Sequence, residues 1–173
     1  MSLFLIGMRG AGKTCSGRRA AALLGVPFVD ADQRVEERAG QGVEAIFREL
    51  GEAAFRSLER EVTLELLQLP GAIIATGGGC VMDPDVRGGL CQLPGVIWLK
   101  ASGEELSRRI SGSNRPSLTG APAWREIPQI LSRREPHYLA CARGTVDTEG
   151  RTVEDVARGL QQLWQELPHH NIR

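Results

Sequence analysis

The chain contains short apolar runs separated by longer stretches of mixed polarity. Four runs consist almost entirely of aliphatic and aromatic residues, at positions 3–6, 26–29, 72–75 and 96–99. Runs of this length and composition predict buried β-strands. A fifth, weaker strand is expected at 145–147.

The stretches between these runs have the spacing of helices. Phe55, Leu58, Val62 and Leu66, for example, recur at steps of three and four residues and form one apolar stripe. Helices are expected at 15–24, 32–38, 43–50, 52–67, 83–90, 103–110, 125–142 and 153–167. Strands that alternate with helices predict an α/β fold around a parallel sheet.

The composition is that of an ordinary globular domain. The 173 residues are 42% hydrophobic and 24% charged, and no repeat or low-complexity linker divides them, so we expect one domain over 1–173. The 21 basic residues balance 21 acidic ones, so the formal net charge is zero. No net positive charge would attract the chain to nucleic acids or to an anionic membrane. We expect neither as a partner.

No segment is typical of export or membrane insertion. No apolar run approaches the length of a membrane span, and the N-terminus lacks the charged and then apolar pattern of a signal peptide. Cys15, Cys80, Cys91 and Cys141 show neither a C-x-x-C pair nor metal-ligand spacing. We therefore expect a soluble cytoplasmic protein whose cysteines are reduced and mostly buried.

The most specific motif lies between the first strand and the first helix. Residues 7–14, Gly-Met-Arg-Gly-Ala-Gly-Lys-Thr, fit the P-loop pattern G-x-x-x-x-G-K-[ST] at every fixed position. Its glycines let backbone N–H groups turn toward a phosphate, and the N-terminus of the helix adds partial positive charge. Lys13 can then reach the terminal phosphates, and Thr14 can bind Mg²⁺. The expected phosphate contacts are Gly10, Ala11, Gly12, Lys13, Thr14 and Cys15.

An acidic pair follows the second strand. A P-loop NTPase needs a carboxylate near Mg²⁺, and the strands at 72–75 and 96–99 lead to Thr76 and Lys100 instead. Asp30 is the candidate because ligands collect at the carboxyl ends of strands in open α/β sheets. Asp32 can face the acceptor. The alternative is that Asp30 caps a helix whose first turn is acidic.

Two further features point to a second substrate. Gly77, Gly78 and Gly79 follow a buried strand, and three glycines suit a ligand that lies against the backbone, although a simple turn would also use them. Arg56 has Glu59 three residues further on. This pair can aim a guanidinium at a carboxylate, or it can be an exposed intrahelical ion pair.

In this order and spacing, the motifs resemble those of shikimate kinases. The matching segments are Gly7–Thr14, Asp30–Asp32, Gly51–Arg56, Ala75–Gly79, Asn114–Pro116 and Arg134–Tyr138. Many NTPases share the P-loop, but the combination of the aspartate pair, Gly-Glu-x-x-Phe-Arg and the triple glycine is much more specific to one family. The sequence Asn-Arg-Pro-Ser-Leu-Thr-Gly, which starts at Asn114, is most similar to the second bacterial isozyme.

The resemblance implies a P-loop kinase of the nucleoside monophosphate kinase-like group. Its fold would be a three-layer sandwich, with a central parallel five-stranded sheet flanked by helices. Residues 30–60 would form the acceptor-binding segment. Residues 111–124, which show no regular pattern and make a long loop, would form a mobile lid.

The resemblance also implies roles at the acceptor. Asp32 would bind the hydroxyls of shikimate and act as the base for the attacking one. Arg56 and Arg134 would hold the shikimate carboxylate. The turn Gly77–Gly79 would contact a hydroxyl through the backbone N–H of Gly78.

At the nucleotide, the resemblance implies that Thr14 and Asp30 bind Mg²⁺. Arg115 of the lid would close over the phosphates of ATP, and Arg109 would lie against adenine. Many members of the family have a proline near adenine after the last strand. This chain has Arg151 in that region instead, where we also expect a nucleotide contact.

The implied reaction is transfer of the γ-phosphoryl group of ATP to the 3-hydroxyl of shikimate, a step in chorismate and aromatic amino acid biosynthesis. Lys13, Mg²⁺ and Arg115 would stabilise the transferring charge. One rival is a kinase for another small metabolite, such as gluconate or a nucleoside monophosphate. A second rival is a nucleotide-binding module without activity, against which the intact Lys13, Asp32 and Arg115 argue. We expect a monomer whose partners are its small-molecule substrates.

Overall fold

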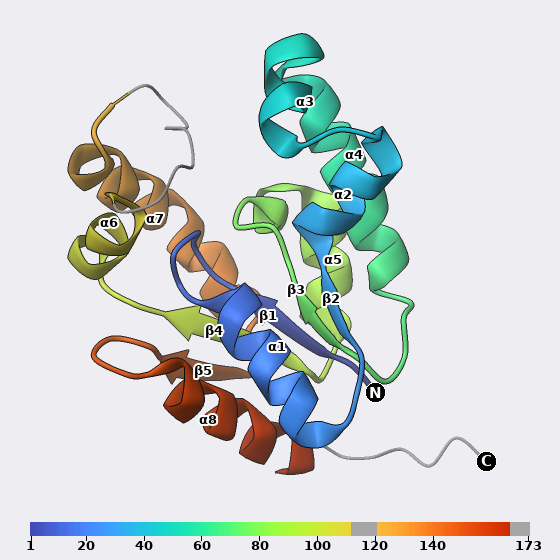
Figure 1. Ribbon diagram of the computed structural model, residues 1–173, viewed down its shortest axis with the longest axis vertical. Helices are drawn as coiled ribbons and strands as arrows, with labels where there is room; N and C mark the ends of the chain where they lie inside the picture. The colour runs from blue at the N-terminus through green and yellow to red at the C-terminus, as the bar shows by residue number, and fades with distance from the viewer. Residues whose placement is uncertain (112–120, 167–173) are drawn as a thin grey trace.

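The structure is a computed structural model that describes residues 1–111 and 121–166. Within these residues, a five-stranded sheet has the order β2-β3-β1-β4-β5, and every pair of neighbouring strands is parallel (Figure 1). The strands are β1 (Leu3–Ile6), β2 (Phe28–Asp30), β3 (Ile73–Ala75), β4 (Val96–Lys100) and β5 (Gly144–Asp147). The predicted strands and their parallel arrangement are confirmed.

Helices fill the segments between the strands. They are α1 (Lys13–Leu24), α2 (Ala31–Ala39), α3 (Val43–Glu49), α4 (Gly51–Leu66), α5 (Pro84–Gln92), α6 (Gly103–Ser111), α7 (Ala123–Cys141) and α8 (Val153–Glu166). The ends of these helices lie within two residues of the predicted ones. The 3₁₀ turn η1 (Cys80–Met82) was not predicted, because three residues are too few to show a helical period.

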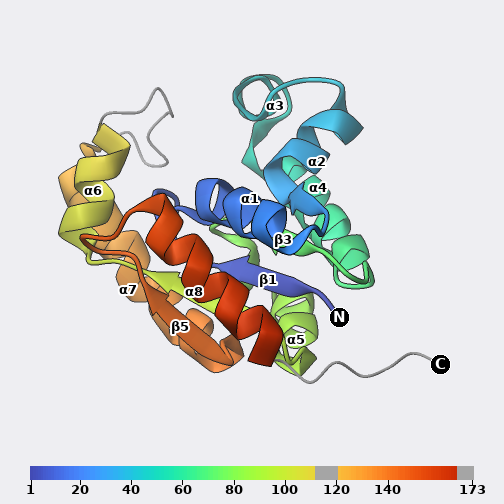
Figure 2. The ribbon, with the colours of Figure 1, turned by 60° about the horizontal axis from the view of Figure 1, so that its bottom comes forward.

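The helices cover both faces of the sheet. α1 and α8 pack against each other on one face, and α5 and α7 lie on the other (Figure 2). Because both faces are covered, the three central strands β1, β3 and β4 are buried along nearly their whole length and have apolar sequences, whereas the edge strands β2 and β5 are only partly buried. This arrangement is the expected three-layer sandwich.

The three strands that precede the functional motifs are neighbours. β1 leads into the P-loop, β2 ends at Asp30, and β3 leads into Gly77–Gly79, and the sheet order places β3 between the other two. Parallel strands end at the same edge, so the three motifs meet there. Around this edge, α2, α3 and α4 lie to one side and α6 and α7 to the other (Figure 1).

The cysteines differ from expectation. Cys91 at the end of α5 and Cys141 at the end of α7 form a disulfide across a sequence separation of 50, and Cys15 is exposed. Only Cys80 is a buried free thiol. The expectation of four reduced cysteines is therefore wrong. Spacing along the chain could not reveal that the ends of two helices on the same face of the sheet meet.

Among the helices that the structure describes, none combines the length and the apolar character that a membrane crossing requires.

Candidate active site

The P-loop between β1 and α1 has the geometry of an anion site. Gly10 and Gly12 have φ values of 82° and 88°, a backbone region that favours glycine. Gly12 is the N-cap of α1 and offers no capping side chain, so the N–H groups of the first helical turn are left for a ligand. Lys13 is buried, and its Nζ donates to the carbonyls of Gly7 and Met8 at 2.7 and 2.9 Å.

Thr14 and Asp30 meet beside this loop. The Thr14 hydroxyl donates to Oδ2 of Asp30 at 2.7 Å, while Oδ1 of Asp30 accepts from the N–H of Asp32 at 3.0 Å and caps α2. Asp30 is thus a helix cap that also faces Thr14. The two oxygen donors suit Mg²⁺, which takes one or two protein ligands and completes its shell with phosphate and water. The described part of the chain has no cluster of three or more His, Cys, Asp or Glu side chains that could hold a metal ion.

A cavity of about 420 Å³ lies next to the triple glycine. Four parts of the chain contribute to its wall: α4 with Arg56 and Glu59, the turn into η1 with Gly79 and Cys80, the start of α5 with Pro84 and Val86, and α7 with Arg134. Two guanidinium groups that are far apart in the sequence therefore face one space. A carboxylate is the anion that two such groups recognise well.

Arg56 is held in this wall by two glutamates. Its Nη1 lies 2.7 Å from Oε2 of Glu59, and its Nη2 lies 3.2 Å from Oε1 of Glu52. The Arg56 side chain is 34% exposed and that of Glu59 only 6%. Burial raises the pKa of Glu59, and the charge of Arg56 partly offsets that rise. The pair is therefore not the exposed intrahelical ion pair that the sequence also allowed.

Each glycine of the turn is in close contact with a neighbouring group. A Cβ on Gly77 would lie 2.1 Å from Oε1 of Glu59 and 3.3 Å from Oδ1 of Asp32. A Cβ on Gly78 would lie 3.2 Å from the backbone nitrogen of Arg9, and one on Gly79 would lie 2.8 Å from Nη1 of Arg56. The turn therefore needs glycine because charged side chains and the P-loop backbone approach it.

The acceptor residues predicted from the sequence come together. Asp32 lies against Gly77, Arg56 against Gly79, and Arg134 donates from Nη1 to the carbonyl of Gly78 at 3.0 Å. Arg134 is 9% exposed, so its charge is held at the cavity rather than in solvent. These side chains come from α2, α4 and α7, and only the fold makes them neighbours.

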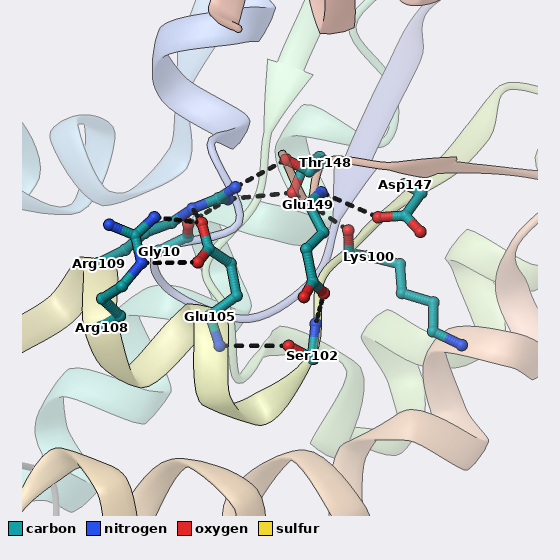
Figure 3. A network of polar contacts seen from close by, with 9 residues as sticks. All are labelled: Gly10, Lys100, Ser102, Glu105, Arg108, Arg109, Asp147, Thr148 and Glu149. Atoms are coloured by element: carbon teal, nitrogen blue, oxygen red, sulfur yellow. Dashed lines mark hydrogen bonds and ion pairs between the residues drawn. The ribbon is translucent and has the colours of Figure 1, made fainter. Parts of the chain in front are cut away.

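Arg109 of α6 reaches the P-loop from the opposite side of the sheet edge (Figure 3). Its Nη1 donates to the carbonyl of Gly10 at 3.2 Å and to Oγ1 of Thr148 at 3.0 Å, and its Nε donates to Glu105 at 2.7 Å. Hydrogen bonds from Arg108 and Arg109 lower the pKa of Glu105 to about 2. Arg151 is exposed in the loop that follows Thr148. Arg115 lies outside the described residues.

Sequence reasoning missed two contacts. Nη2 of Arg9 in the P-loop pairs with Oε1 of Glu126 in the first turn of α7 at 2.8 Å, and the Glu126 side chain is fully buried. No sequence pattern indicates this pair. Tyr138 donates to the carbonyl of Gly78 at 2.5 Å. A signal existed for Tyr138, because it follows Arg134 by four residues and so lies on the same helical face.

The fold and this site define a P-loop kinase, with a phosphate loop after β1 and an anion-binding cavity after β3. The family model for shikimate kinase matches residues 9–165. The chain belongs to the shikimate kinase family. A shikimate kinase of Paracidovorax citrulli is 38% identical over 177 residues, which cover 100% of this chain and 95% of the relative. One from Stenotrophomonas maltophilia is 38% identical over 160 residues, covering 92% and 89%.

Solved structures agree with this family. The shikimate kinase from Acinetobacter baumannii in complex with shikimate has a TM-score of 0.88 and 33% identity, covering 95% of this chain and 92% of that chain. The shikimate kinase from Aquifex aeolicus has a TM-score of 0.82 and 26% identity, covering 95% and 96%. A gluconokinase from Sinorhizobium meliloti, at 14% identity and a TM-score of 0.57, shares the fold alone.

Alkylation of Cys15 tests the nucleotide side of the site. Cys15 is the exposed thiol beside the P-loop, whereas burial raises the pKa of Cys80 to about 12 and the other two cysteines are joined. Iodoacetamide should therefore modify one thiol, and MgATP should slow that reaction severalfold because phosphates would cover the start of α1. Peptide mass mapping identifies the modified cysteine. Shikimate alone should not protect it, and equal rates with and without MgATP would place the nucleotide elsewhere.

Proposed function

We propose that the protein transfers the γ-phosphoryl group of ATP to the 3-hydroxyl of shikimate and releases shikimate 3-phosphate and ADP. The observation that carries this proposal is the cavity in which Arg56 and Arg134 converge beside the Gly77–Gly79 turn, next to Asp32. Such a cavity fits a ring acid that bears hydroxyl groups. The A. baumannii relative was solved in complex with shikimate, which supports the same acceptor here. The reaction belongs to chorismate and aromatic amino acid biosynthesis.

On the donor side, the phosphates of ATP bind the backbone N–H groups from Gly10 to Cys15. Lys13 carries the positive charge closest to the transferring group, and its buried position keeps that charge directed at the loop. Arg115 adds a second positive charge when the lid closes over the nucleotide. The ends of the predicted lid 111–124 are helical, because Ser111 belongs to α6 and α7 begins at Ala123. Arg109 and Arg151 contact the nucleoside end. The hydrogen bond from Arg109 to Gly10 supports a position of Arg109 beside the P-loop.

Asp32 is the acceptor-side base in this proposal. Its carboxylate lies next to Gly77, and the following glycine, Gly78, approaches the P-loop backbone at Arg9. It accepts a hydrogen bond from the attacking hydroxyl, orients the oxygen toward the γ-phosphorus and takes the proton late in the transfer. The Arg56 and Arg134 guanidinium groups fix the other end of the ring by its carboxylate. Segment 30–60 therefore acts as the acceptor-binding part of a single domain.

Thr14 and Asp30 would hold Mg²⁺ between them and the phosphates. The ion would neutralise charge on the β- and γ-phosphoryl oxygens. The chain contributes a hydroxyl that is already aligned, because Asp30 fixes it at 2.7 Å and α2 in turn fixes Asp30.

Asp30→Ala should raise the Mg²⁺ concentration that supports half-maximal turnover. The expected increase is about 10-fold or more, because one of few protein ligands is lost. Titration of the rate with MgCl₂ at fixed ATP measures it, and EDTA should abolish turnover of the wild type. Asp85→Ala, which removes an exposed aspartate from the start of α5, is the control. An unchanged Mg²⁺ requirement in Asp30→Ala would remove Asp30 from the metal site.

ADP release with different acceptors tests the proposed function. The wild type should release ADP with shikimate, and it should release little with gluconate, with AMP or without an acceptor. Turnover with gluconate alone would identify a different small-acid kinase. ATP-dependent thermal stabilisation without any turnover would identify a nucleotide-binding module.

The protein acts as a monomer in this proposal, because one chain supplies residues to both halves of the site. The proposed location is the cytoplasm. Sedimentation in solution should give a mass near 18.8 kDa. A dimer would contradict the monomer and leave the reaction unaffected.

A further inference from the structure

The carbonyl of Gly78 is held by two side chains of α7. It accepts hydrogen bonds from the Tyr138 hydroxyl at 2.5 Å and from Nη1 of Arg134 at 3.0 Å. Tyr138 is fully buried, and its ring stacks on Trp98 of β4 with centroids 5.8 Å apart. Burial raises the pKa of Tyr138, so its hydroxyl stays protonated and remains a donor at neutral pH.

This carbonyl belongs to the middle peptide of a tight turn. The N–H of Cys80 donates to the carbonyl of Gly77 at 3.3 Å, so residues 77–80 form a β-turn. Gly79 has φ −99° and ψ −8°, the values of the second central residue of a type I turn. A type II turn has the middle peptide rotated by about half a turn and needs positive φ at Gly79, which glycine adopts freely. With glycine at both central positions, local sterics do not choose between the two turns.

The choice decides which groups face the cavity. The C=O of Gly78 and the N–H of Gly79 share one trans peptide, so they point in opposite directions. Holding the carbonyl at the Tyr138 hydroxyl turns the N–H of Gly79 away from that hydroxyl, and Gly79 lines the cavity. The rotated peptide would instead turn the carbonyl oxygen of Gly78 away from Tyr138 and toward the cavity. There it would repel the carboxylate of an acceptor or take the place of a donor to its hydroxyl group.

The same carbonyl also fixes Arg134. Its Nη1 is occupied by Gly78, whereas its Nη2 lies 3.3 Å from the position of a Cβ on Gly79. One edge of the guanidinium is therefore anchored behind the turn while another faces the cavity. Loss of the anchored orientation of Gly78 would release both the N–H of Gly79 and the guanidinium of Arg134.

We propose that Tyr138 is a positioning residue for acceptor binding: its hydroxyl, together with Arg134, holds the Gly78–Gly79 peptide in the type I orientation and so presents the N–H of Gly79 and the guanidinium of Arg134 to the acceptor. This inference rests on the proposed function, because it assigns Tyr138 to the acceptor half of that site. Tyr138 does not itself touch the acceptor.

Tyr138→Phe is the direct test, because it keeps the ring on Trp98 and removes only the hydroxyl. The KM for shikimate should rise about 5- to 10-fold, the effect of losing one buried hydrogen bond, while the KM for ATP stays within about twofold. Ser2→Ala is the matched control. Ser2 is also buried and donates to a backbone carbonyl, that of Leu69, at the opposite end of the sheet. It should leave both KM values unchanged.

Two results would overturn the inference: a lowered melting temperature with unchanged KM for shikimate, or equal rises in both KM values. If Tyr138→Phe does not fold, the wild type labelled with ¹⁵N-glycine serves instead. Added shikimate should move the Gly79 amide signal in the ¹H–¹⁵N spectrum, and an unmoved signal would refute the orientation. The wild-type rate with shikimate separates the two proposals. A wild type without that rate defeats the proposed function, whereas an active wild type with an unaffected Tyr138→Phe defeats only this inference.

Discussion

Asp32→Asn should bind ATP as the wild type does and should lose about 10²- to 10⁴-fold in turnover with shikimate, the range that removal of a general base produces. The amide keeps the size of the carboxylate and can still contact a hydroxyl, but it cannot take the proton. Asp32 lies against Gly77, the first glycine of the turn. ADP release in a coupled assay measures turnover, and calorimetry measures ATP binding.

Asp155→Asn is a suitable control for this variant. Asp155 is in the first turn of α8 as Asp32 is in the first turn of α2, and both side chains are acids near a helix start. The control should keep its turnover number within about twofold. Retained turnover in Asp32→Asn would show that the proton leaves by another route, and loss of ATP binding would show that Asp32 supports the P-loop instead.

Arg56→Ala should raise the KM for shikimate about 10- to 100-fold and should change the KM for ATP little. The reason is that a charge-assisted hydrogen bond contributes about 1.5–3 kcal/mol, and Arg56 lines the cavity, to which no residue of the P-loop contributes. Arg56→Lys keeps the charge without the planar fork and should have an intermediate KM. Arg48→Ala removes an exposed arginine of α3 and should behave as the wild type. Equal changes in both KM values would make Arg56 structural.

The stability of Arg56→Ala should depend on pH in a defined direction. Burial already raises the pKa of Glu59, and loss of Arg56 removes the group that counteracts this rise. The folded state then binds a proton that the unfolded state releases at lower pH, so stability falls as pH rises above the ordinary range of a carboxyl. Melting curves at pH 5 and pH 8 should show a larger gap between variant and wild type at the higher pH.

Local patterns in the sequence predicted the elements, because strands and helices here carry continuous apolar runs and clear helical stripes. The P-loop was predictable for the same reason, since its glycines and Lys13 lie within eight consecutive residues. Of the predicted acceptor residues, Asp32 and Arg56 were candidates from the sequence itself, whereas Arg134 could be named only through a family resemblance. Their convergence depends on the order of the strands and on α7 crossing the sheet edge, which no local pattern records.

Other features depend on contacts between distant segments and escaped prediction. Cys91 and Cys141 meet because α5 and α7 share one face of the sheet. The pair of Arg9 and Glu126 joins the P-loop to α7 across most of the chain. The glycine turn was predicted as a place of close approach, and the structure adds what approaches it. The neighbours are the carboxylates of Asp32 and Glu59, the arginines of the cavity and the backbone of the P-loop.

Identification of the phosphorylated product tests the central claim most directly. Wild-type protein, MgATP and shikimate should yield one phosphate monoester per ADP formed, and its ³¹P signal should couple to the proton on C3 of the ring. Inorganic phosphate as the main product would show hydrolysis without transfer. A phosphate on another hydroxyl, or ADP release that does not depend on shikimate, would contradict the proposed acceptor geometry.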